Sequence, residues 1–355
     1  MMRDQPPRQT MSTGALPTRR SLHVSRRSVL TWAAALSVLT ACAEPKSPST
    51  TLPVQPRTRP LEHGVYLTEG PADEAALRAY EDLIGSSPQW ILLFCDWTIA
   101  APPLLELDAT LAAGAVPVLT WEPWHAPHPG SPVAATDQSQ FSLARILAGD
   151  HDNHIRTWGE ALASWNRDVV LRFAHEMNGN WYPWGFGVQG NTPRQYVRAW
   201  HHVRSIFAAA GASSVRWCWA PNIPWAPDDT SDHASFEDFF PGPGAVDLLG
   251  IDGYNWASTN SGWTAPEELF GAGLKELRDL RGAHPIVVTE TASSEGLEPW
   301  QSKAEWIRQL FDYLVNQPDV ESAIWFHTDK EHNWQVDSSQ EALAAYREAV
   351  ASLRP

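Results

Sequence analysis

The stretch Arg172-Phe173-Ala174-His175-Glu176-Met177-Asn178-Gly179-Asn180-Trp181-Tyr182-Pro183-Trp184 decides how this chain is interpreted. It follows Asp168-Val169-Val170-Leu171, a short β-branched run of the kind that forms a buried parallel strand. Glu176 therefore falls at the carboxyl end of a strand, where barrels and open α/β sheets bind their ligands. A carboxyl group beside indole rings suits sugar cleavage, because the acid protonates the glycosidic oxygen while the rings pack against the sugar. A tryptophan-rich edge of the core with an incidental glutamate is the alternative.

The remainder of the chain repeats this unit of strand and helix. Apolar runs alternate with amphipathic segments, and the runs lie at His63–Thr68, Trp90–Trp97, Val116–Trp121, Asp168–His175, Ser214–Ala220, Val246–Tyr254, Pro285–Glu290 and Ser322–His327. Such a series predicts an α/β fold of the (β/α)8 type, the TIM barrel, in which Glu176 ends the fourth strand. A doubly wound open sheet is the alternative, but no Gly-rich phosphate-binding loop follows any of the runs.

Three segments carry signals for the start of a helix. Thr192-Pro193-Arg194-Gln195 has the form of a capping box with proline in the first turn, and Gly211 ends the helix that it opens. Thr264-Ala265-Pro266-Glu267 has a similar form, and Ser338-Ser339-Gln340-Glu341 opens the last helix. We therefore expect helices between the strands, as the barrel requires.

The amino-terminal segment resembles an export signal. Ser25-Arg26-Arg27-Ser28-Val29-Leu30 has the twin-arginine form, and the apolar run 31–40 that follows is too short to span a membrane. Leu39-Thr40-Ala41-Cys42 resembles a bacterial lipobox, in which Cys42 is lipidated and becomes the new amino terminus. A chance apolar segment ending in cysteine is the alternative. We expect export through the twin-arginine pathway, with lipid anchoring at the bacterial cell surface or the periplasmic side, or secretion.

Composition and charge indicate where the domains begin and end and which class of ligand the protein binds. We expect a lipoprotein signal peptide over residues 1–42, a tether rich in Pro, Ser and Thr over 43–60, and a catalytic (β/α)8 domain over 61–355. The net charge of −15 disfavours nucleic acid and anionic membranes, so we expect a neutral ligand, and membrane contact only through the lipid anchor. Cys95 and Cys218 lie in apolar runs and are expected to be buried free thiols. We expect a monomer.

Tryptophan is unusually frequent, with 19 residues in the chain. Many of them fall at the ends of the expected strands or in the loops after them: Trp97, Trp121, Trp124, Trp181, Trp184, Trp219, Trp225, Trp256, Trp263, Trp325 and Trp334. A core needs no bias towards one end of a barrel. The pattern therefore predicts an aromatic cleft for carbohydrate at that end.

A second carboxylate is needed for retaining glycoside hydrolysis, because one group acts as the acid and the other as the nucleophile. Glu290, in Ile286-Val287-Val288-Thr289-Glu290-Thr291, ends the seventh expected strand. A single glutamate there could be a cap or a salt-bridge residue, but two of them at the ends of strands four and seven favour a catalytic pair. Glu122, in Trp121-Glu122-Pro123-Trp124-His125, also ends a strand and is the one rival, for which we favour substrate contact or a structural role.

These motifs resemble glycoside hydrolase family 26. The resemblance rests on His175-Glu176-Met177-Asn178-Gly179-Asn180-Trp181-Tyr182-Pro183-Trp184 and Thr289-Glu290, and it extends from about His63 to Val336. The family contains β-mannanases, mixed-linkage β-glucanases and a few β-1,3-xylanases, and it belongs to clan A of the barrels, with the acid on strand four and the nucleophile on strand seven. The resemblance implies that Glu176 is the acid/base and Glu290 the nucleophile. We expect no cofactor and no metal ion.

The expected substrate-binding residues are His175, Trp181, Asn222, Asp252, Tyr254, Trp256 and Trp325, and the resemblance implies the roles of His175, Asp252, Tyr254 and Trp325. Similar enzymes use the residue at Tyr254 to hydrogen-bond the nucleophile and the residue at Asp252 to contact substrate. His175 would contact the sugar in the −1 subsite, and Trp325 resembles the stacking platform there. Structural roles in the core are the alternatives for His175 and Tyr254. Arg172 and Glu176 share a strand face by period two, so we expect Arg172 to point into the barrel.

The expected substrate is a neutral β-linked polysaccharide, cut internally with retention. We prefer β-1,4-mannan or glucomannan, although many of the mannanases carry Arg where Phe326 stands here. A mixed-linkage β-1,3-1,4-glucanase and an exopolysaccharide-trimming hydrolase of the same family are alternatives, and a non-catalytic glycan-binding lipoprotein is an alternative of another class. A metal hydrolase is disfavoured because the His175-Glu176 pair lacks the second histidine of the HExxH motif.

Overall fold

The structure, a computed structural model, describes residues 60–127, 136–224, 234–257, 262–280 and 282–353, all within the compact unit Pro53–Pro355. The expected signal peptide with its Cys42, the tether up to residue 59 and Trp225 lie outside these residues. Among the helices that are described, none is long and apolar enough to cross a membrane.

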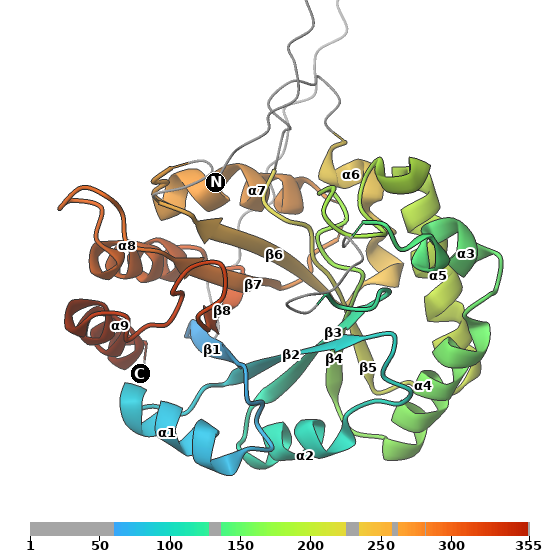
Figure 1. Cartoon of the computed structure of the whole chain (residues 1–355), viewed down its shortest axis with the longest axis horizontal. Helices are drawn as coiled ribbons and strands as arrows, with labels where there is room; N and C mark the ends of the chain where they lie inside the picture. The colour runs from blue at the N-terminus through green and yellow to red at the C-terminus, as the bar shows by residue number, and fades with distance from the viewer. Residues whose placement is uncertain (1–59, 128–135, 225–233, 258–261, 281, 354–355) are drawn as a thin grey trace, which may run out of the picture. The chain divides into compact units, whose positions relative to one another are not determined.

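Parallel strands close into a barrel in the order in which they occur in the chain, from β1 to β8 (Figure 1). They are β1 Glu62–Leu67, β2 Trp90–Asp96, β3 Val116–Glu122, β4 Val169–Phe173, β5 Val215–Trp219, β6 Leu248–Asn255, β7 Ile286–Ser293 and β8 Val320–His327. The prediction of a TIM barrel is confirmed, and each strand overlaps the apolar run expected for it. Glu176 follows β4, and Glu290 lies within β7 and not at its last residue.

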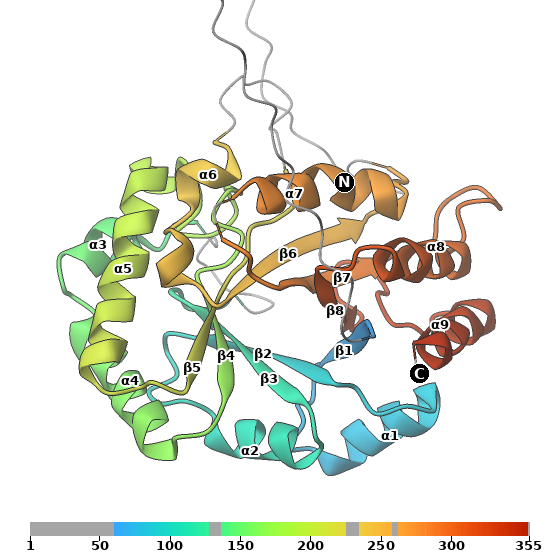
Figure 2. The same ribbon diagram turned by 180° about the vertical axis from the view of Figure 1, so that it is seen from behind.

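Helices form a ring around these strands, as Figure 1 shows and Figure 2 repeats from behind. They are α1 Glu74–Ile84, α2 Leu104–Ala112, α3 Leu143–Leu147, α4 Asp152–Trp165, α5 Pro193–Ala209, α6 Phe236–Phe239, α7 Pro266–Asp279, α8 Lys303–Val315 and α9 Gln340–Ser352. Short 3-10 turns lie at Ser139–Phe141, Val188–Gly190 and Pro243–Ala245. Each long helix buries one apolar face against the barrel, so the strand ends are held in a fixed ring.

All three predicted helix starts are confirmed, two of them with a side-chain cap. Thr192 accepts a hydrogen bond from the backbone N–H of Gln195, and the backbone N–H of Thr192 donates to the Gln195 side chain, which makes a capping box. Ser339 likewise accepts from the backbone of α9. The third helix, α7, also starts in the predicted segment, with Pro266 in its first turn, but its N-cap is Ala265, whose methyl group cannot accept a hydrogen bond. Thr264 lies one residue too early in the chain to cap.

The layer between barrel and helices takes much of the tryptophan that the sequence assigned to a cleft. Six of those residues are buried. Four of the six contact rings of the surrounding helices, namely Trp97, Trp121, Trp219 and Trp325, whereas Trp184 and Trp334 contact aromatic residues of the site. Trp121, for example, stacks on Trp158 of α4 with ring centroids 4.9 Å apart. The excess of tryptophan at the strand ends therefore serves packing as well as the cleft. Cys95 and Cys218 are buried free thiols, as predicted, and burial raises the pKa of each to about 12.

Candidate active site

The backbone that presents Glu176 adopts an unusual conformation. Ala174 and Glu176 have φ angles of 45° and 50°, in the left-handed region that non-glycine residues rarely occupy. Hydrogen bonds from their N–H groups hold both residues: Ala174 donates to the carbonyl of Trp121 at 3.1 Å and Glu176 to that of Ala220 at 2.8 Å. Local strain of this kind persists where the surroundings enforce it, and it often marks a functional site.

The carboxyl group of Glu176 receives two side-chain hydrogen bonds. Nε1 of Trp181 donates to Oε2 and Nδ2 of Asn222 donates to Oε1, each at 2.7 Å. Asn178 holds Asn222 in place, because its amide group exchanges two hydrogen bonds of 2.9 Å with the Asn222 backbone. Burial and the negative charge of Glu290 raise the pKa of Glu176 to about 7. Glu176 can therefore hold and release a proton near neutral pH.

Glu290 lies in the opposite electrostatic environment. Its Oε1 forms a buried ion pair with Nη2 of Arg172, and its Oε2 accepts a hydrogen bond of 2.6 Å from the hydroxyl of Tyr254. A guanidinium and a phenol both stabilise negative charge on the carboxylate. The site thus combines a carboxyl group that can hold a proton near pH 7 with a second one that is paired with a cation.

Arg172 points into the barrel, as predicted, and organises the residues beneath the pair. Its Nη1 lies 2.7 Å from Oδ2 of Asp252, and its Nε donates to Thr120. Thr289 donates to the other oxygen of Asp252 at 2.5 Å. Asp252 is fully buried, and its contact with substrate stays a prediction. Its carboxylate anchors the guanidinium that supports Glu290.

His175 lies between the pair and the aromatic loop after β4. Its Nε2 is 3.2 Å from the hydroxyl of Tyr182 and 3.8 Å from Oε1 of Glu290. Burial and the positive charge of Arg172 lower the pKa of His175 well below its ordinary value, so the imidazole is neutral. This position is compatible with the sugar contact expected for it.

Three of these residues also group like the ligands of a metal ion. Ligand atoms of His175, Asp252 and Glu290 lie within 4.8 Å of one another. The Arg172 guanidinium, however, already pairs with both carboxylates. A protein cation therefore occupies the position that would attract a metal ion, and this donor set does not fit one.

Aromatic residues form the wall beside Tyr254. Its ring centroid lies 6.1 Å from that of Trp256, 5.2 Å from that of Trp334 and 5.8 Å from that of Phe326. Trp256 is partly exposed, as a cleft residue would be, and so is Trp181. Phe326 also stacks on Tyr66 of β1 with centroids 4.7 Å apart. The sequence analysis missed this stack, although Tyr66 and Phe326 are each the next-to-last residue of their strand.

Trp325 does not belong to this wall, and the prediction that it forms a stacking platform is wrong. The side chain is buried and faces the helices, where its ring contacts Trp306 of α8 and Tyr346 of α9. Its Nε1 donates to the carbonyl of Trp334 at 2.8 Å. The neighbouring residue on β8, Phe326, faces the site instead.

Glu122 also belongs to the site. It is the last residue of β3 and is buried, and burial together with the charge of Glu290 raises the pKa of Glu122 to about 8. It is therefore a neutral acid at pH 7. A neutral carboxyl group can donate a hydrogen bond but is a poor nucleophile, which agrees with the secondary role expected for it.

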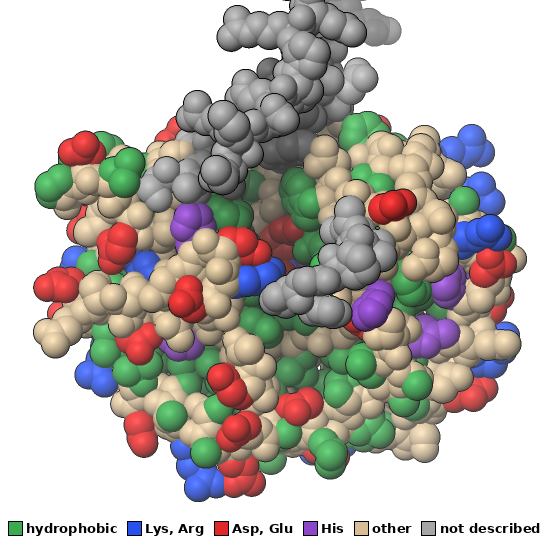
Figure 3. All heavy atoms as spheres, in the orientation of Figure 1, with side chains coloured by type: hydrophobic (Ala, Val, Ile, Leu, Met, Phe, Trp, Pro, Cys, Tyr) green, Lys and Arg blue, Asp and Glu red, His purple; other side chains and the backbone are tan. Residues whose placement is uncertain are grey.

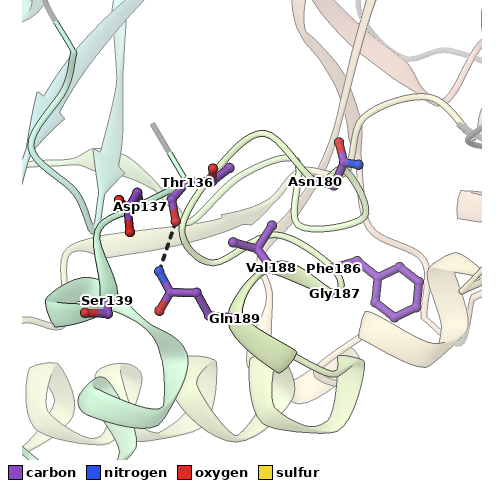
Figure 4. Close-up of a pocket in the computed structure, with 8 residues that line it drawn as sticks. All are labelled: Thr136, Asp137, Ser139, Asn180, Phe186, Gly187, Val188 and Gln189. Carbon is purple, nitrogen blue, oxygen red and sulfur yellow. Dashed lines mark hydrogen bonds between the residues drawn. The ribbon is translucent and has the colours of Figure 1, made fainter. Parts of the chain in front are cut away.

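The surface of the barrel is hollowed on one face (Figure 3). Figure 3 shows acidic and hydrophobic atoms in a hollow near the centre of the face seen in Figure 1. A separate open pocket of about 750 Å³ lies between the loops after β3 and β4 (Figure 4). It is lined by Thr136, Asp137, Ser139, Asn180, Phe186, Gly187, Val188 and Gln189. None of these residues belongs to the acid and nucleophile pair, but Asn180 precedes Trp181 and so connects the pocket to the site.

Comparison with known proteins identifies a matching family and a relative of this chain. The family model of glycosyl hydrolase family 26 matches residues 133–290, a segment that contains both glutamates. Endoglucanase H of Acetivibrio thermocellus is 30% identical over 299 residues, which cover 82% of this chain. The chain spans only about 30% of the length of that relative.

Solved structures share the fold at low sequence identity. The catalytic domain of a GH26 endo-β-1,4-mannanase from Bacillus sp. JAMB-750 is 16% identical and has a TM-score of 0.59, with 82% of this chain and 86% of that chain covered. A GH26 β-mannanase from Bacteroides ovatus is 15% identical and has a TM-score of 0.57, with 83% and 90% covered. The solved structures show the shared barrel, and the family match together with the relative at 30% identity identifies residues 133–290, which contain both glutamates, as glycosyl hydrolase family 26.

Proposed function

We propose that the chain is a retaining endo-glycoside hydrolase that cuts a neutral β-linked glucan. The observation that carries the proposal is the contrast between the two glutamates. Glu176 has a pKa raised to about 7 and is hydrogen-bonded by neutral donors, whereas Glu290 is paired with Arg172 and Tyr254. A glycosidase needs this division between an acid and a charged nucleophile.

The reaction proceeds in two displacements. In the first, Glu290 attacks the anomeric carbon, Glu176 gives its proton to the glycosidic oxygen, and the bond between that carbon and oxygen breaks. In the second, Glu176 removes a proton from water, whose oxygen attacks the anomeric carbon and releases Glu290. Two inversions at one carbon leave its configuration unchanged. His175, as a neutral imidazole beside Glu290, is placed to hydrogen-bond a sugar hydroxyl.

A glucan is preferred over mannan for two reasons. Endoglucanase H is the relative with 30% identity, and its name describes cleavage of glucan, whereas the mannanases named above are 15% and 16% identical and inform the fold alone. In addition, Phe326 and Tyr66 form an apolar stack where many mannanases carry a guanidinium. This reverses the preference for mannan that the family's commonest activity suggests. Mannan and glucomannan remain the competing substrates.

Initial rates on mixed-linkage β-glucan, mannan and glucomannan under identical conditions test the proposal. Glucose and mannose differ in the configuration of one hydroxyl, and a hydrogen bond to it contributes about 1–3 kcal/mol, which changes a rate tenfold or more. We expect the glucan to be cut at least about tenfold faster. Faster cleavage of either mannose polymer would reverse the order, and binding without release of reducing ends would indicate a glycan-binding protein. Proton NMR of the first products should show the β-anomer.

Anchoring through Cys42 is proposed from the twin-arginine motif and the lipobox. Cys42→Ser should abolish incorporation of labelled fatty acid and move the protein from the membrane fraction to the soluble fraction. Cys95→Ser, which changes a buried thiol of the barrel, is the matched control and should keep the label. Label retained by Cys42→Ser would contradict the anchor.

A further inference from the structure

An exposed aromatic pair lies in the loops that follow β6 and β7. Trp300 is 65% exposed and Leu297 is 79% exposed, which is unusual for side chains of this size. The partly exposed ring of Trp263 meets that of Trp300 edge to face, with centroids 6.2 Å apart. We call these two tryptophans the Trp263–Trp300 platform. Clustered apolar groups at a surface mark binding sites more often than scattered ones do.

The loop that carries Trp300 is held by its own hydrogen bonds. The side-chain oxygen of Gln301 accepts from the backbone N–H groups of Leu297 and Glu298, each at 3.1 Å. The carbonyl of Gln301 accepts from Gly296 at 2.8 Å. Trp300 is therefore displayed on an ordered turn, which lowers the entropy that a ligand would lose on binding.

The two loops of the platform are continuous, through hydrogen bonds, with the strand end at the candidate active site. Asn255, the residue after Tyr254, accepts from the backbone N–H of Ser294 at 3.0 Å and, with its side chain, from that of Thr264 at 3.0 Å. Ser294 in turn donates its hydroxyl to the carbonyl of Trp256 at 3.1 Å. Both loops of the platform are thus tied to the strand end that carries the aromatic wall.

From this continuity we infer that the platform binds a distal sugar unit of the same glycan chain that is cut between Glu176 and Glu290. The inference rests on the proposed function. An indole face stacks on the C–H face of a pyranose ring without requiring charge. Exposed carboxylates in the same segments, Glu267 and Glu298, disfavour uronic acids and leave a neutral glycan as the occupant.

The test compares Trp300→Ala and Trp300→Phe in the full-length chain. The control is Leu105→Ala, which removes an 81% exposed side chain from α2, on the opposite side of the barrel from α7 (Figure 1). We expect Trp300→Ala to raise KM for mixed-linkage β-glucan about tenfold, because one stacked ring is lost. The variant should change kcat less than about twofold. Trp300→Phe should restore most of the affinity, because it keeps an aromatic face.

Binding is measured separately on a Glu290→Ala background, by retardation in gels that contain the same glucan. Trp300→Ala should reduce the retardation and Leu105→Ala should not. Equal KM and equal retardation for Trp300→Ala and Leu105→Ala, in a chain that still cuts the glucan, would refute the platform and leave the proposed function standing. A chain with Glu290 intact that neither cuts nor binds any glucan or mannan would refute both.

Discussion

Glu290→Ala should lower the rate of glucan hydrolysis by at least about 10⁴-fold, the order of loss that follows removal of a catalytic nucleophile. The carboxylate of Glu290 is paired with the Arg172 guanidinium and accepts a hydrogen bond from the Tyr254 hydroxyl. Initial rates of reducing-end release measure the loss. Glu160→Ala, which removes an exposed carboxylate from α4, is the control and should keep the full rate.

Chemical rescue identifies the position of the missing group. In Glu290→Ala, azide can enter the space left by the carboxylate and attack the anomeric carbon of an activated aryl β-glycoside. The expected product is an α-glycosyl azide, because only one inversion has occurred. A rate within about tenfold of the wild type, or no azide product, would place the nucleophile elsewhere. Glu122 is the next buried carboxyl group to test.

Glu176→Ala should separate substrates by their leaving groups. Polysaccharide needs a proton on the departing oxygen, so its hydrolysis should fall by about 10²–10⁴-fold. Formation of the glycosyl-enzyme from an aryl glycoside with an acidic phenol needs no such proton and should keep most of its rate. Pre-steady-state release of the phenol measures this step. An equal loss on both substrates would assign Glu176 another role.

The pH profile provides a second measure of the same residue. The acid works when it carries its proton, so kcat/KM for the polysaccharide should fall as pH rises through about 7, where burial and Glu290 place the pKa of Glu176. In Glu176→Gln the side chain does not titrate. The decrease in kcat/KM near pH 7 should then be absent from the residual activity. A pH profile of unchanged shape would assign this decrease to another group.

The chain's sequence predicts the ends of the strands better than the direction of side chains within them. Apolar runs locate every strand, and the polar residues after β4 and in β7 locate Glu176 and Glu290. The sequence predicts less well which face of a strand each side chain occupies. Strands buried on both faces show no alternation of polar and apolar residues, so Trp325 and Phe326 could not be assigned to outside and inside from β8 alone.

The roles of Asp252 and of the tryptophans are hard to assign from the sequence for a related reason. A carboxylate on the inner face of a strand can contact substrate or lie beneath the site, and the choice depends on its depth. Only the pairing with Arg172 and Thr289 shows that Asp252 lies beneath. Indole rings are equally ambiguous, because Trp121 fills the space between barrel and helix with the same surface that Trp181 offers to the site.

Heat resistance and turnover compete at the turn after β4. Ala174 and Glu176 keep left-handed backbone angles that cost about 1–3 kcal/mol each, so this turn lowers the melting temperature of the whole domain. Ala174→Gly would relieve the backbone strain in the turn, but it would also make the position of the Glu176 carboxyl group less precise. An engineer who wants a thermostable variant should therefore leave this turn untouched and work on exposed helical positions far from it, such as Leu105.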